Sequence, residues 1–335
     1  MKVLVTGASG FVGKAIVEEL RRNEVKVIEL QSGRVEKGNN TTSNNYFENK
    51  ADITNKDEVL ELKKIGEIDA IVHAAGLAHQ FKDVKKEEFW SVNVEGTANI
   101  LELGKLLKIK HFILISSVSV YGDVAENRFV LPGINEDVEC RPQDFYAESK
   151  LEAEKITSRK CEEKDVALTI LRLATVIGEE DRGNFLRLIK AIDKRRFLWV
   201  GKGVNYKSLI HREDVAAAVC KLLFDKTSEE KYKTGEIFNV SAEPLQMKEI
   251  VEIISRSLNK NVFGLSVNEN ILDYLLYFGS KKLKIKKLEK LRRTVEKWLA
   301  NDAYSAQKIK REYQYEAKIK TDEAITREVK WYLQQ

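Results

Sequence analysis

Three glycines directly after the first apolar run constrain the fold of this chain most strongly. Residues 3–13 read Val-Leu-Val-Thr-Gly-Ala-Ser-Gly-Phe-Val-Gly, so Gly7, Gly10 and Gly13 lie between a predicted strand and a predicted helix. In such a turn the first glycine allows a tight bend, the second lets a pyrophosphate approach the backbone, and the third lets the helix pack closely on the strand. Free N–H groups and the positive end of the helix dipole favour phosphate there. The turn therefore predicts dinucleotide binding.

Apolar runs alternate with helical patterns over the first 175 residues. The predicted strands are Lys2–Thr6, Lys26–Leu30, Asn45–Asp52, Ala70–Ala74, His111–Ser116 and Ala167–Leu173. Most are continuous apolar runs, which is typical of strands buried on both faces of a parallel sheet. Helical patterns such as Gly13–Arg22 and Gly96–Leu107 lie between them. We therefore expect an α/β fold built on a doubly wound, parallel Rossmann sheet.

The pattern becomes irregular beyond about Val176. Two helical patterns and one late strand are predicted there, at Gly183–Arg196, Leu245–Leu258 and Ile237–Val240. No Gly/Ser linker separates the halves, so we expect a smaller C-terminal α+β substrate lobe packed against the sheet. The expected division is a Rossmann domain over residues 1–178, to which 206–242 partly return, and a lobe formed by 179–205 and 243–335.

The composition excludes several classes of protein. With 43% hydrophobic and 33% charged residues, the chain is not disordered. A net charge of +5 is too small to indicate nucleic-acid binding, although it suits a site for phosphates. The three cysteines and four histidines show no disulfide or metal-ligand spacing, so we expect no metal and a reducing compartment. No signal peptide and no apolar run of ~18 residues is present, which favours a cytoplasmic protein without a membrane span.

The end of the second predicted strand bears on the choice between NAD and NADP. An acidic residue there would accept a hydrogen bond from the adenosine ribose, as NAD binding requires. Gln31 stands at that position, and Arg34 follows within reach of a 2′-phosphate. Arg34 is equally compatible with a solvated loop position. NADP therefore remains an alternative to NAD.

Tyr146 and Lys150 indicate the chemistry. A spacing of four residues places both on one face of a helix, one turn apart. A phenol with an ordinary pKa of ~10 is a poor base at neutral pH. A neighbouring ammonium and a positively charged nicotinamide would stabilise the phenolate and lower its pKa. The predicted strand through Ile113 ends in serines, whose hydroxyl groups can bind the same substrate oxygen. The pattern predicts hydride transfer at a secondary alcohol or ketone.

Six motifs follow in order over the first 150 residues. They are Thr6–Gly13, Asp52-Ile53, His73–Gly76, Asn93–Thr97, Ser116–Gly122 and Tyr146–Lys150. Together they resemble the extended short-chain dehydrogenase/reductase family, within it the nucleotide-sugar epimerases and dehydratases, and especially the UDP-hexose 4-epimerases. Later segments that look like substrate-lobe landmarks of this family are Leu171-Arg172, Gly183–Phe185 and Ser208–Asp214. The resemblance implies a nucleotide-sugar substrate and a homodimer formed through helices near Gly96–Leu107 and Tyr146–Arg159.

Position by position, the resemblance implies Ser117 as the catalytic hydroxyl, Tyr146 as general acid/base, and Lys150 as its activator and nicotinamide-ribose ligand. The cofactor would contact Gly7, Ser9, Gly10, Phe11, Val12, Gly13, Gln31, Arg34, Asp52, Ile53, Ala74, Ala75, Gly76, Asn93 and Lys150. The substrate would contact Ser119, Thr175, Asn184 and Lys207. Ser119 is a second candidate for the catalytic hydroxyl. Asn93 also fits a helix cap, and His73 fits a packed strand-end residue better than a catalyst.

The motifs favour some reactions over others. Dehydratases of this family resemble one another in carrying an Asp-Glu pair directly after the catalytic hydroxyl. This chain has Val118 and Ser119 at those positions, so dehydration is disfavoured. We expect NAD-dependent epimerisation at C4 of a UDP-hexose. The alternatives are an NAD(P)H-dependent 4-keto-sugar-nucleotide reductase of surface-polysaccharide synthesis and, more distantly, a non-catalytic NADP-binding sensor or scaffold. Such sensors and scaffolds typically lack the Tyr or the Lys, and this chain has both, at Tyr146 and Lys150.

A strongly basic segment follows near the C-terminus. Ser280–Ala300 contains nine Lys or Arg residues and two Glu, with apolar residues at helical spacing. One interpretation is a peripheral contact of the Lys281–Lys297 helix with an anionic membrane or a membrane-bound enzyme. The other, which we favour, is a solvated helix beside the substrate site.

Overall fold

The computed structural model describes residues 1–32, 49–78, 84–122, 131, 133–163, 165–225, 235–261, 266–267 and 299–335. Within these residues a seven-stranded sheet has the order β11-β6-β5-β4-β1-β2-β3, and each neighbouring pair is parallel. The strands are β1 (Lys2–Thr6), β2 (Lys26–Ser32), β3 (Lys50–Ala51), β4 (Ala70–His73), β5 (His111–Ser117), β6 (Ala167–Leu173) and β11 (Glu236–Val240). The expected Rossmann sheet is thereby confirmed.

Among the strands of the sheet, the one expected at Asn45–Asp52 differs most from the structure. Residues 45–48 lie outside the described residues, and β3 covers only Lys50 and Ala51. Asp52 follows the strand, and its Oδ1 accepts hydrogen bonds from both the N–H and the hydroxyl of Thr54, at 3.0 and 2.8 Å. A side chain that bonds the backbone two residues ahead favours a turn over a strand.

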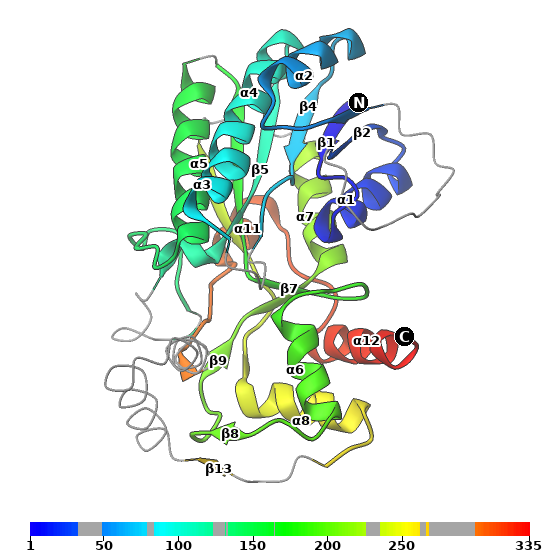
Figure 1. Cartoon of the computed structure of the whole chain (residues 1–335), viewed down its shortest axis with the longest axis vertical. Coiled ribbons are helices and arrows are strands. Elements are labelled where there is room, and N and C mark those ends of the chain that lie inside the picture. Colours follow the sequence, from blue (N-terminus) through cyan, green and yellow to red (C-terminus); the bar gives the residue numbers. More distant parts are fainter. Residues whose placement is uncertain are drawn as a thin grey trace.

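Helices cover both faces of the sheet (Figure 1). One face carries α1 (Phe11–Arg22) and α7 (Arg212–Phe224), and the other carries α2 (Lys56–Glu61), α3 (Lys86–Phe89), α4 (Gly96–Leu106) and α5 (Phe145–Glu162). The alternation of side chains along β1 reflects this arrangement, because Val3 and Val5 join the apolar cluster beneath α1 and α7, whereas Leu4 joins the cluster beneath α4. Burial on both faces explains the continuous apolar runs of the strands.

A third apolar cluster forms the core of the lobe that the sequence predicts to bind substrate. It is built largely from α6 (Asn184–Asp193), α8 (Met247–Ser257) and α12 (Thr321–Leu333). Short strand pairs join it: β7 (Thr175–Ile177) with β10 (Leu209–His211), β9 (Tyr206–Lys207) with β12 (Leu245–Gln246), and β8 (Trp199–Val200) with β13 (Ser266–Val267). Figure 1 places this lobe below the carboxyl ends of the strands of the main sheet.

Part of the C-terminal third packs on the main sheet. Tyr304 stacks on Tyr121, and Tyr313, at the end of α11 (Gln307–Tyr313), packs edge-on against Phe238 of β11. The exact division into domain and lobe stays a prediction, as does the homodimer through α4 and α5. Among the helices described, none is both long and apolar enough to cross a membrane.

Candidate active site

Two glycines of the turn, Gly7 and Gly13, are packed so tightly that neither position can hold a side chain. Gly7 has φ +65°, and a Cβ there would lie 2.7 Å from Ala75 N. A Cβ on Gly13 would lie 2.1 Å from the Gly7 carbonyl oxygen. Gly10 caps α1 without a side-chain hydrogen bond, and the first helical turn contains no acid. The first N–H groups of α1 are therefore available to an anion, and the turn fits the pyrophosphate of a dinucleotide.

A cavity of about 260 Å³ opens at the carboxyl ends of β4, β5 and β6. It is lined by Val12, Ala74, Gly76, Leu77, Ala78, Ile115, Ser116, Ser117, Tyr146, Lys150, Leu173, Ala174 and Val176. The cavity thus brings the start of α1 and the turn after β4 together with all three predicted catalytic residues. Among the described residues, no Asp or Glu lines it.

Helix α5 supplies Tyr146 and Lys150. The helix begins after Asp144, whose carboxylate accepts a hydrogen bond from Ala147 N at 2.9 Å. Burial raises the pKa of Tyr146, and a hydrogen bond from Ser117 opposes that rise. Burial lowers the pKa of Lys150 to about 8. The Lys150 ammonium donates to the Ile115 carbonyl at 2.5 Å. In the chain alone, burial of the phenol has the largest effect on the Tyr146 pKa and raises it. The expected lowering by Lys150 together with a bound nicotinamide stays a prediction.

The two candidate hydroxyl groups are neighbours at the end of β5. Ser117 lies at the start of the short helix η3 (Val118–Tyr121) and lines the cavity, whereas Ser119 does not line it. Ser119 donates to Ser117 Oγ through its backbone N–H at 3.2 Å and through its hydroxyl at 3.0 Å. This arrangement favours Ser117 as the group that reaches a substrate, with Ser119 behind it.

Asn93 and His73 connect elements around the cavity. Asn93 is buried in the π-helical turn η2 (Trp90–Glu95) and exchanges hydrogen bonds of 2.7 and 3.1 Å with the backbone of Leu77. It also donates to Ser149 Oγ at 2.9 Å, so it ties the turn after β4 to α5 and is not a helix cap. His73 is buried between the hydroxyl groups of Thr6 and Thr97. Burial lowers its pKa to about 3, which identifies a neutral, packed histidine, as expected.

The residues predicted for the adenosine end lie apart from this cavity. Gln31 pairs with Lys50 between β2 and β3, and Asp52 follows β3. Ile53 packs against Gly96, where a Cβ would lie 2.8 Å from Ile53 Cδ1. Arg34 lies outside the described residues, so its proposed contact with a 2′-phosphate stays a prediction.

The predicted substrate residues other than Ser119 lie on three separate elements, β7, α6 and β9. Thr175, the first residue of β7, and Asn184, the first residue of α6, are both exposed. Lys207 is mostly buried, and its ammonium forms a 2.5 Å ion pair with Asp302. None of the three lines the cavity, and their contacts with a substrate stay predictions.

A buried polar network beneath the serines was missed from the sequence. Glu154 accepts a hydrogen bond from Ser116 Oγ at 2.5 Å and binds the guanidinium of Arg172 at 2.7–3.2 Å. That guanidinium lies 4.8 Å from the ring centre of Tyr121. Glu154 is one helical turn beyond Lys150, and this spacing is the signal that sequence reasoning could have used. The network fixes α5 against β5 and β6, and thereby the position of Lys150.

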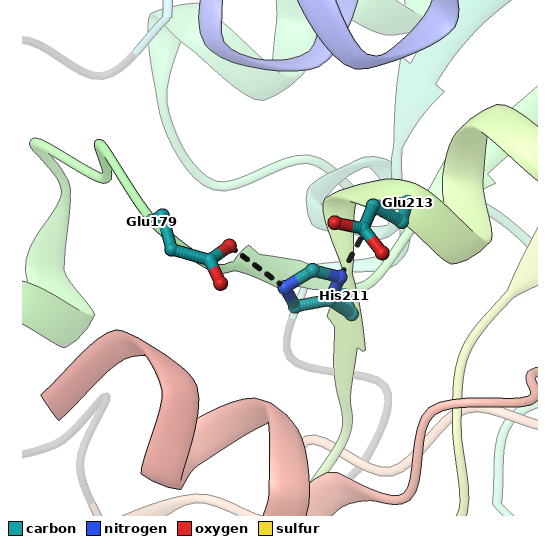
Figure 2. Close-up of side chains that lie close together, drawn as sticks. All are labelled: Glu179, His211 and Glu213. Carbon is teal, nitrogen blue, oxygen red and sulfur yellow. Dashed lines mark hydrogen bonds and ion pairs between the residues drawn. The ribbon is translucent and has the colours of Figure 1, made fainter. Parts of the chain in front are cut away.

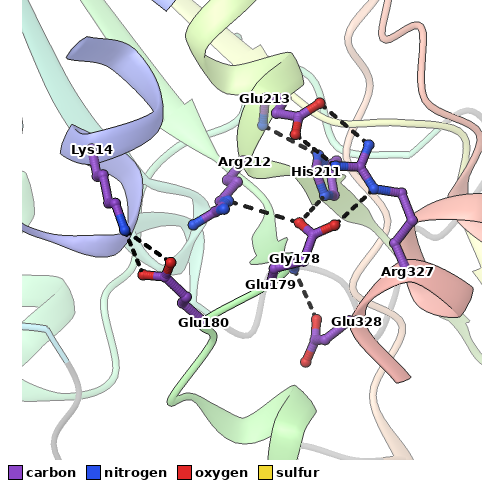
Figure 3. A network of polar contacts seen from close by, with 9 residues as sticks. All are labelled: Lys14, Gly178, Glu179, Glu180, His211, Arg212, Glu213, Arg327 and Glu328. Carbon is purple, nitrogen blue, oxygen red and sulfur yellow. Dashed lines mark hydrogen bonds and ion pairs between the residues drawn. The ribbon is translucent and has the colours of Figure 1, made fainter. Parts of the chain in front are cut away.

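Glu179, His211 and Glu213 form a cluster with the spacing of metal ligands (Figure 2). Arg327 of α12 donates to Glu179 at 2.8 Å and to Glu213 at 2.6 and 3.2 Å. Figure 3 shows the same guanidinium beside both carboxylates. Because Arg327 already neutralises the two acids, the cluster is better explained as an ionic contact between α12, the residues after β7, and the start of α7 than as a metal site.

The residues after β7 also contact α1 and α12. Glu180 forms an ion pair of 2.8 Å with Lys14 of α1, and Glu328 of α12 accepts a hydrogen bond from Gly178 N at 2.8 Å (Figure 3). This loop therefore contacts both the helix of the glycine turn and the C-terminal helix. None of these residues was singled out from the sequence.

Comparison with known proteins places the chain in a family. Residues 3–241 match the model of the NAD dependent epimerase/dehydratase family. The chain is 30% identical over 270 residues, covering 78% of this chain and 73% of the relative, to N-acetyl-alpha-D-glucosaminyl-diphospho-ditrans,octacis-undecaprenol 4-epimerase of Escherichia coli O157:H7. It is 26% identical to human dTDP-D-glucose 4,6-dehydratase over 82% of this chain and 78% of the relative.

A solved structure agrees with the fold over the whole chain. UDP-glucuronic acid 4-epimerase from Bacillus cereus in complex with NAD superposes with a TM-score of 0.75, at 21% identity, covering 100% of this chain and 99% of that chain. The family match spans the glycine turn, the predicted catalytic residues Tyr146 and Lys150, and the cavity that they line. The chain is therefore an enzyme of the NAD-dependent epimerase/dehydratase family.

Proposed function

We propose that the chain epimerises C4 of a hexose carried on a diphosphate, with a UDP-hexose as the first substrate to test. The observation that carries this proposal is a cavity that holds Ser117, Tyr146 and Lys150 and is lined by no carboxylate among the described residues. Bound NAD would supply the acceptor and donor of hydride. The glycine turn, Gly76 and Lys150 would hold it.

The protein's own groups account for the proton transfers. Tyr146 would take the proton of the C4 hydroxyl and return it after C4 is reduced from the opposite face. Ser117 would hydrogen-bond the same oxygen, and its contact with Tyr146 opposes the effect of burial on the phenol pKa. Lys150, fixed by Ile115 and by the network around Glu154, would orient the cofactor ribose and add positive charge near the phenol. The apolar lining from Leu173, Ala174 and Val176 would limit the access of water to the ketone.

Two observations argue against dehydration. The positions after Ser117 are occupied by Val118, which is buried, and Ser119, which is bonded to Ser117. Neither side chain can act as a carboxylic acid or carboxylate toward C5 and C6 of a sugar. The similarity to the human dehydratase therefore supports a shared fold and a shared oxidation step, but not the elimination of water.

A second candidate differs in the carrier of the sugar. The relative from Escherichia coli O157:H7 acts, by its name, on a sugar joined through a diphosphate to undecaprenol. The same C4 chemistry would then proceed on a polyprenyl-linked substrate in place of a nucleotide-linked one. A 4-ketoreductase remains the alternative reaction, since Gln31 replaces the acid that typically accompanies NAD.

The proposal is tested by supplying three kinds of substrate to the purified protein without added cofactor. We expect UDP-hexose or short-chain polyprenyl-diphosphate hexose to give its C4 epimer, detected by chromatography of the released sugars. Formation of a 4-keto-6-deoxy sugar would indicate a dehydratase. Turnover of a 4-keto sugar nucleotide only when NADPH is added would identify a reductase and overturn the epimerase proposal.

A further inference from the structure

The walls of the cofactor cavity differ in how firmly they are held. Ile115 and Leu173 line it from β5 and β6, which are hydrogen-bonded neighbours in the main sheet. Val176 lines it from β7, which lies outside that sheet and pairs with β10. Separating β5 from β6 would break their ladder of hydrogen bonds, whereas a shift of β7 leaves that ladder intact. The wall at Val176 is therefore the one that moves most readily.

The size of the cavity requires such a movement. A volume of about 260 Å³ lies below the roughly 300–1,000 Å³ of most pockets for small ligands. A nicotinamide that reaches Tyr146 and Lys150 from the glycine turn needs more room than this. We therefore expect the wall at Val176 to give way when the cofactor enters and leaves.

An ion pair fastens this wall to α1. Residues 178–183 connect β7 to α6, and we call them the β7 loop. Glu180 of this loop accepts hydrogen bonds from the Lys14 ammonium through both carboxylate oxygens, at 2.8 and 3.0 Å (Figure 3). Lys14 follows Val12, which lines the cavity from α1, by two residues, and Glu180 follows Val176 by four. The pair thus joins two walls of the cavity close to the residues that line it.

The strength of this ion pair suits a contact that opens and recloses. The hydrogen bond from Lys14 lowers the pKa of Glu180, so Glu180 is ionised at neutral pH. The side chains of Lys14 and Glu180 are 44% and 49% exposed, so water screens their attraction. The pair therefore holds the wall without making its closure permanent.

A second contact between the same elements leaves donors unsatisfied. Arg212, the first residue of α7, has its guanidinium carbon 5.6 Å from the centre of the Phe11 ring of α1. Its Nε lies 3.9 Å from Glu179, which is too far for a hydrogen bond. Arg212 Nε and Nη1 are buried and have no hydrogen-bond partner among the described residues. Buried donors without acceptors cost free energy, so the closed arrangement contains a contact that favours opening.

The β7 loop is anchored on its other side to α12. Glu328, which is fully buried, accepts a hydrogen bond from Gly178 N at 2.8 Å. Arg327 donates to Glu179 at 2.8 Å. These contacts are less exposed than the pair of Lys14 and Glu180. When the wall moves, the loop should therefore stay with α12 and part from α1.

We propose that Glu180 is a positioning residue that, paired with Lys14, closes the cofactor cavity and slows the passage of NAD in both directions. The inference rests on NAD lying in this cavity, as the proposed function has it, and not on the reaction that follows. Glu180 does not line the cavity, so it acts through the position of β7. Opening and closing of loops sets the rate of ligand release in many enzymes.

Exchange of NADH for NAD measures this passage directly. The protein, stripped of nucleotide and loaded with NADH, is mixed with a large excess of NAD, and the loss of bound NADH fluorescence gives the dissociation rate. Mixing the stripped protein with NADH gives the association rate. In E180Q both rates should rise about 2- to 5-fold, as loss of a surface ion pair allows, while Kd stays within ~2-fold of the original.

Lys14 provides the second half of the test. K14Q breaks the same ion pair, so K14Q/E180Q should release NADH no more than ~1.5-fold faster than the faster single variant. Effects that multiply would overturn the proposal, because the two residues would then act independently. Slower release of NADH from E180Q would also overturn it, since Glu180 would then only repel the phosphates of the cofactor.

A matched control removes an ion pair at the opposite edge of the sheet. Glu67, which precedes the amino end of β4, pairs with Lys108 at 2.7 Å, and both side chains are exposed. E67Q should exchange NADH like the unmodified protein, and unchanged thermal unfolding would confirm that each variant is folded. Unchanged exchange in E180Q, or equal acceleration in E67Q, would overturn the proposal.

The exchange experiment needs no sugar, so it is independent of the proposed reaction. Faster exchange in E180Q by a protein that turns over no hexose substrate would support the role of Glu180 and overturn the epimerase proposal. Unchanged exchange in E180Q by a protein that epimerises a hexose would do the reverse.

Discussion

Ser119 donates a hydrogen bond from its hydroxyl to Ser117 Oγ across 3.0 Å. Ser117 in turn hydrogen-bonds the Tyr146 phenol and thereby opposes the rise in pKa that burial causes. The three hydroxyl groups form a chain that runs from η3 to the cavity. Ser117 and Tyr146 line the cavity and Ser119 does not, so removal of these hydroxyl groups should have graded effects.

Replacement of Ser117 by alanine should impair turnover more than replacement of Ser119. Ser117 lines the cavity and contacts the general acid/base, so S117A should lower kcat by ~10²-fold. S119A removes only a donor to Ser117 and should cost less than ~10-fold, with an unchanged KM. Steady-state kinetics of the two variants provide the measurement. A larger loss in S119A would assign the catalytic hydroxyl to Ser119.

Replacement of Tyr146 by phenylalanine should separate chemistry from binding. The variant keeps the aromatic contact with Phe89, whose ring centre lies 6.0 Å away, but loses the proton-transferring oxygen. We expect turnover to fall by at least ~10²-fold while NAD binding, measured by calorimetry, stays within ~3-fold of the original. Near-normal turnover would contradict the assignment of Tyr146 as the general acid/base.

Replacement of Glu328 by glutamine should change how stability depends on pH. Burial, with the nearby charge of Asp181, raises the pKa of Glu328 to about 9 from an ordinary value near 4.5. A carboxyl whose pKa is raised on folding stabilises the protein fully below pH 4.5, and that contribution is lost as the pH rises toward 9.

Glutamine keeps an oxygen for Gly178 N and has no such titration. E328Q should therefore lie within ~1 kcal/mol of the original protein near pH 5 and exceed it in unfolding free energy by about 4–5 kcal/mol at pH 8. Urea unfolding at the two pH values provides the test. Equal stabilities at pH 8 would mean that Glu328 is ionised at little cost.

The buried pair of Glu154 and Arg172 should show strong coupling. Both side chains are at most 5% exposed and bind each other at 2.7 Å. R172L leaves an uncompensated buried carboxylate and should destabilise the protein by about 3–5 kcal/mol. The double variant E154L/R172L should recover part of that loss, because neither charge remains. Denaturant unfolding of the single and double variants measures the coupling, and purely additive effects would contradict it.

Much of the fold was accessible from the sequence because its signals are local. The glycine turn, the apolar strands and the helical pattern of Gly96–Leu107 each depend on residues close together in the chain. Their positions differ from β1, α1 and α4 by at most a few residues at the ends. The strand around residue 50 was less well predicted, because the Asp52–Thr54 contact ends it early.

The site was predicted only where a motif marks it. Ser117, Tyr146 and Lys150 meet in one cavity, but the network of Ser116, Glu154 and Arg172 depends on packing between β5, α5 and β6. The spacing of Glu154 from Lys150 places both on one face of α5, but no local pattern pairs Glu154 with Arg172. The same holds for Arg327, which reaches Glu179 from 148 residues away. The burial that raises the pKa of Tyr146 was likewise not accessible, because a sequence gives the neighbouring charge but not the degree of burial.

The purified protein should carry NAD that survives gel filtration. An epimerase uses one cofactor molecule twice in each turnover, so loss of the reduced cofactor would leave a ketone behind. The tightly packed glycine turn and the buried Lys150 provide contacts for such retention. Gln31 argues against tight NAD binding, since it stands where an acid would bind the adenosine ribose of NAD. Acid release followed by chromatography identifies the bound cofactor, and adding NADPH or NADH to the stripped protein compares their affinities. An empty protein that binds NADPH more tightly than NADH would support a 4-ketoreductase, because a reductase must release its spent cofactor before each new turnover.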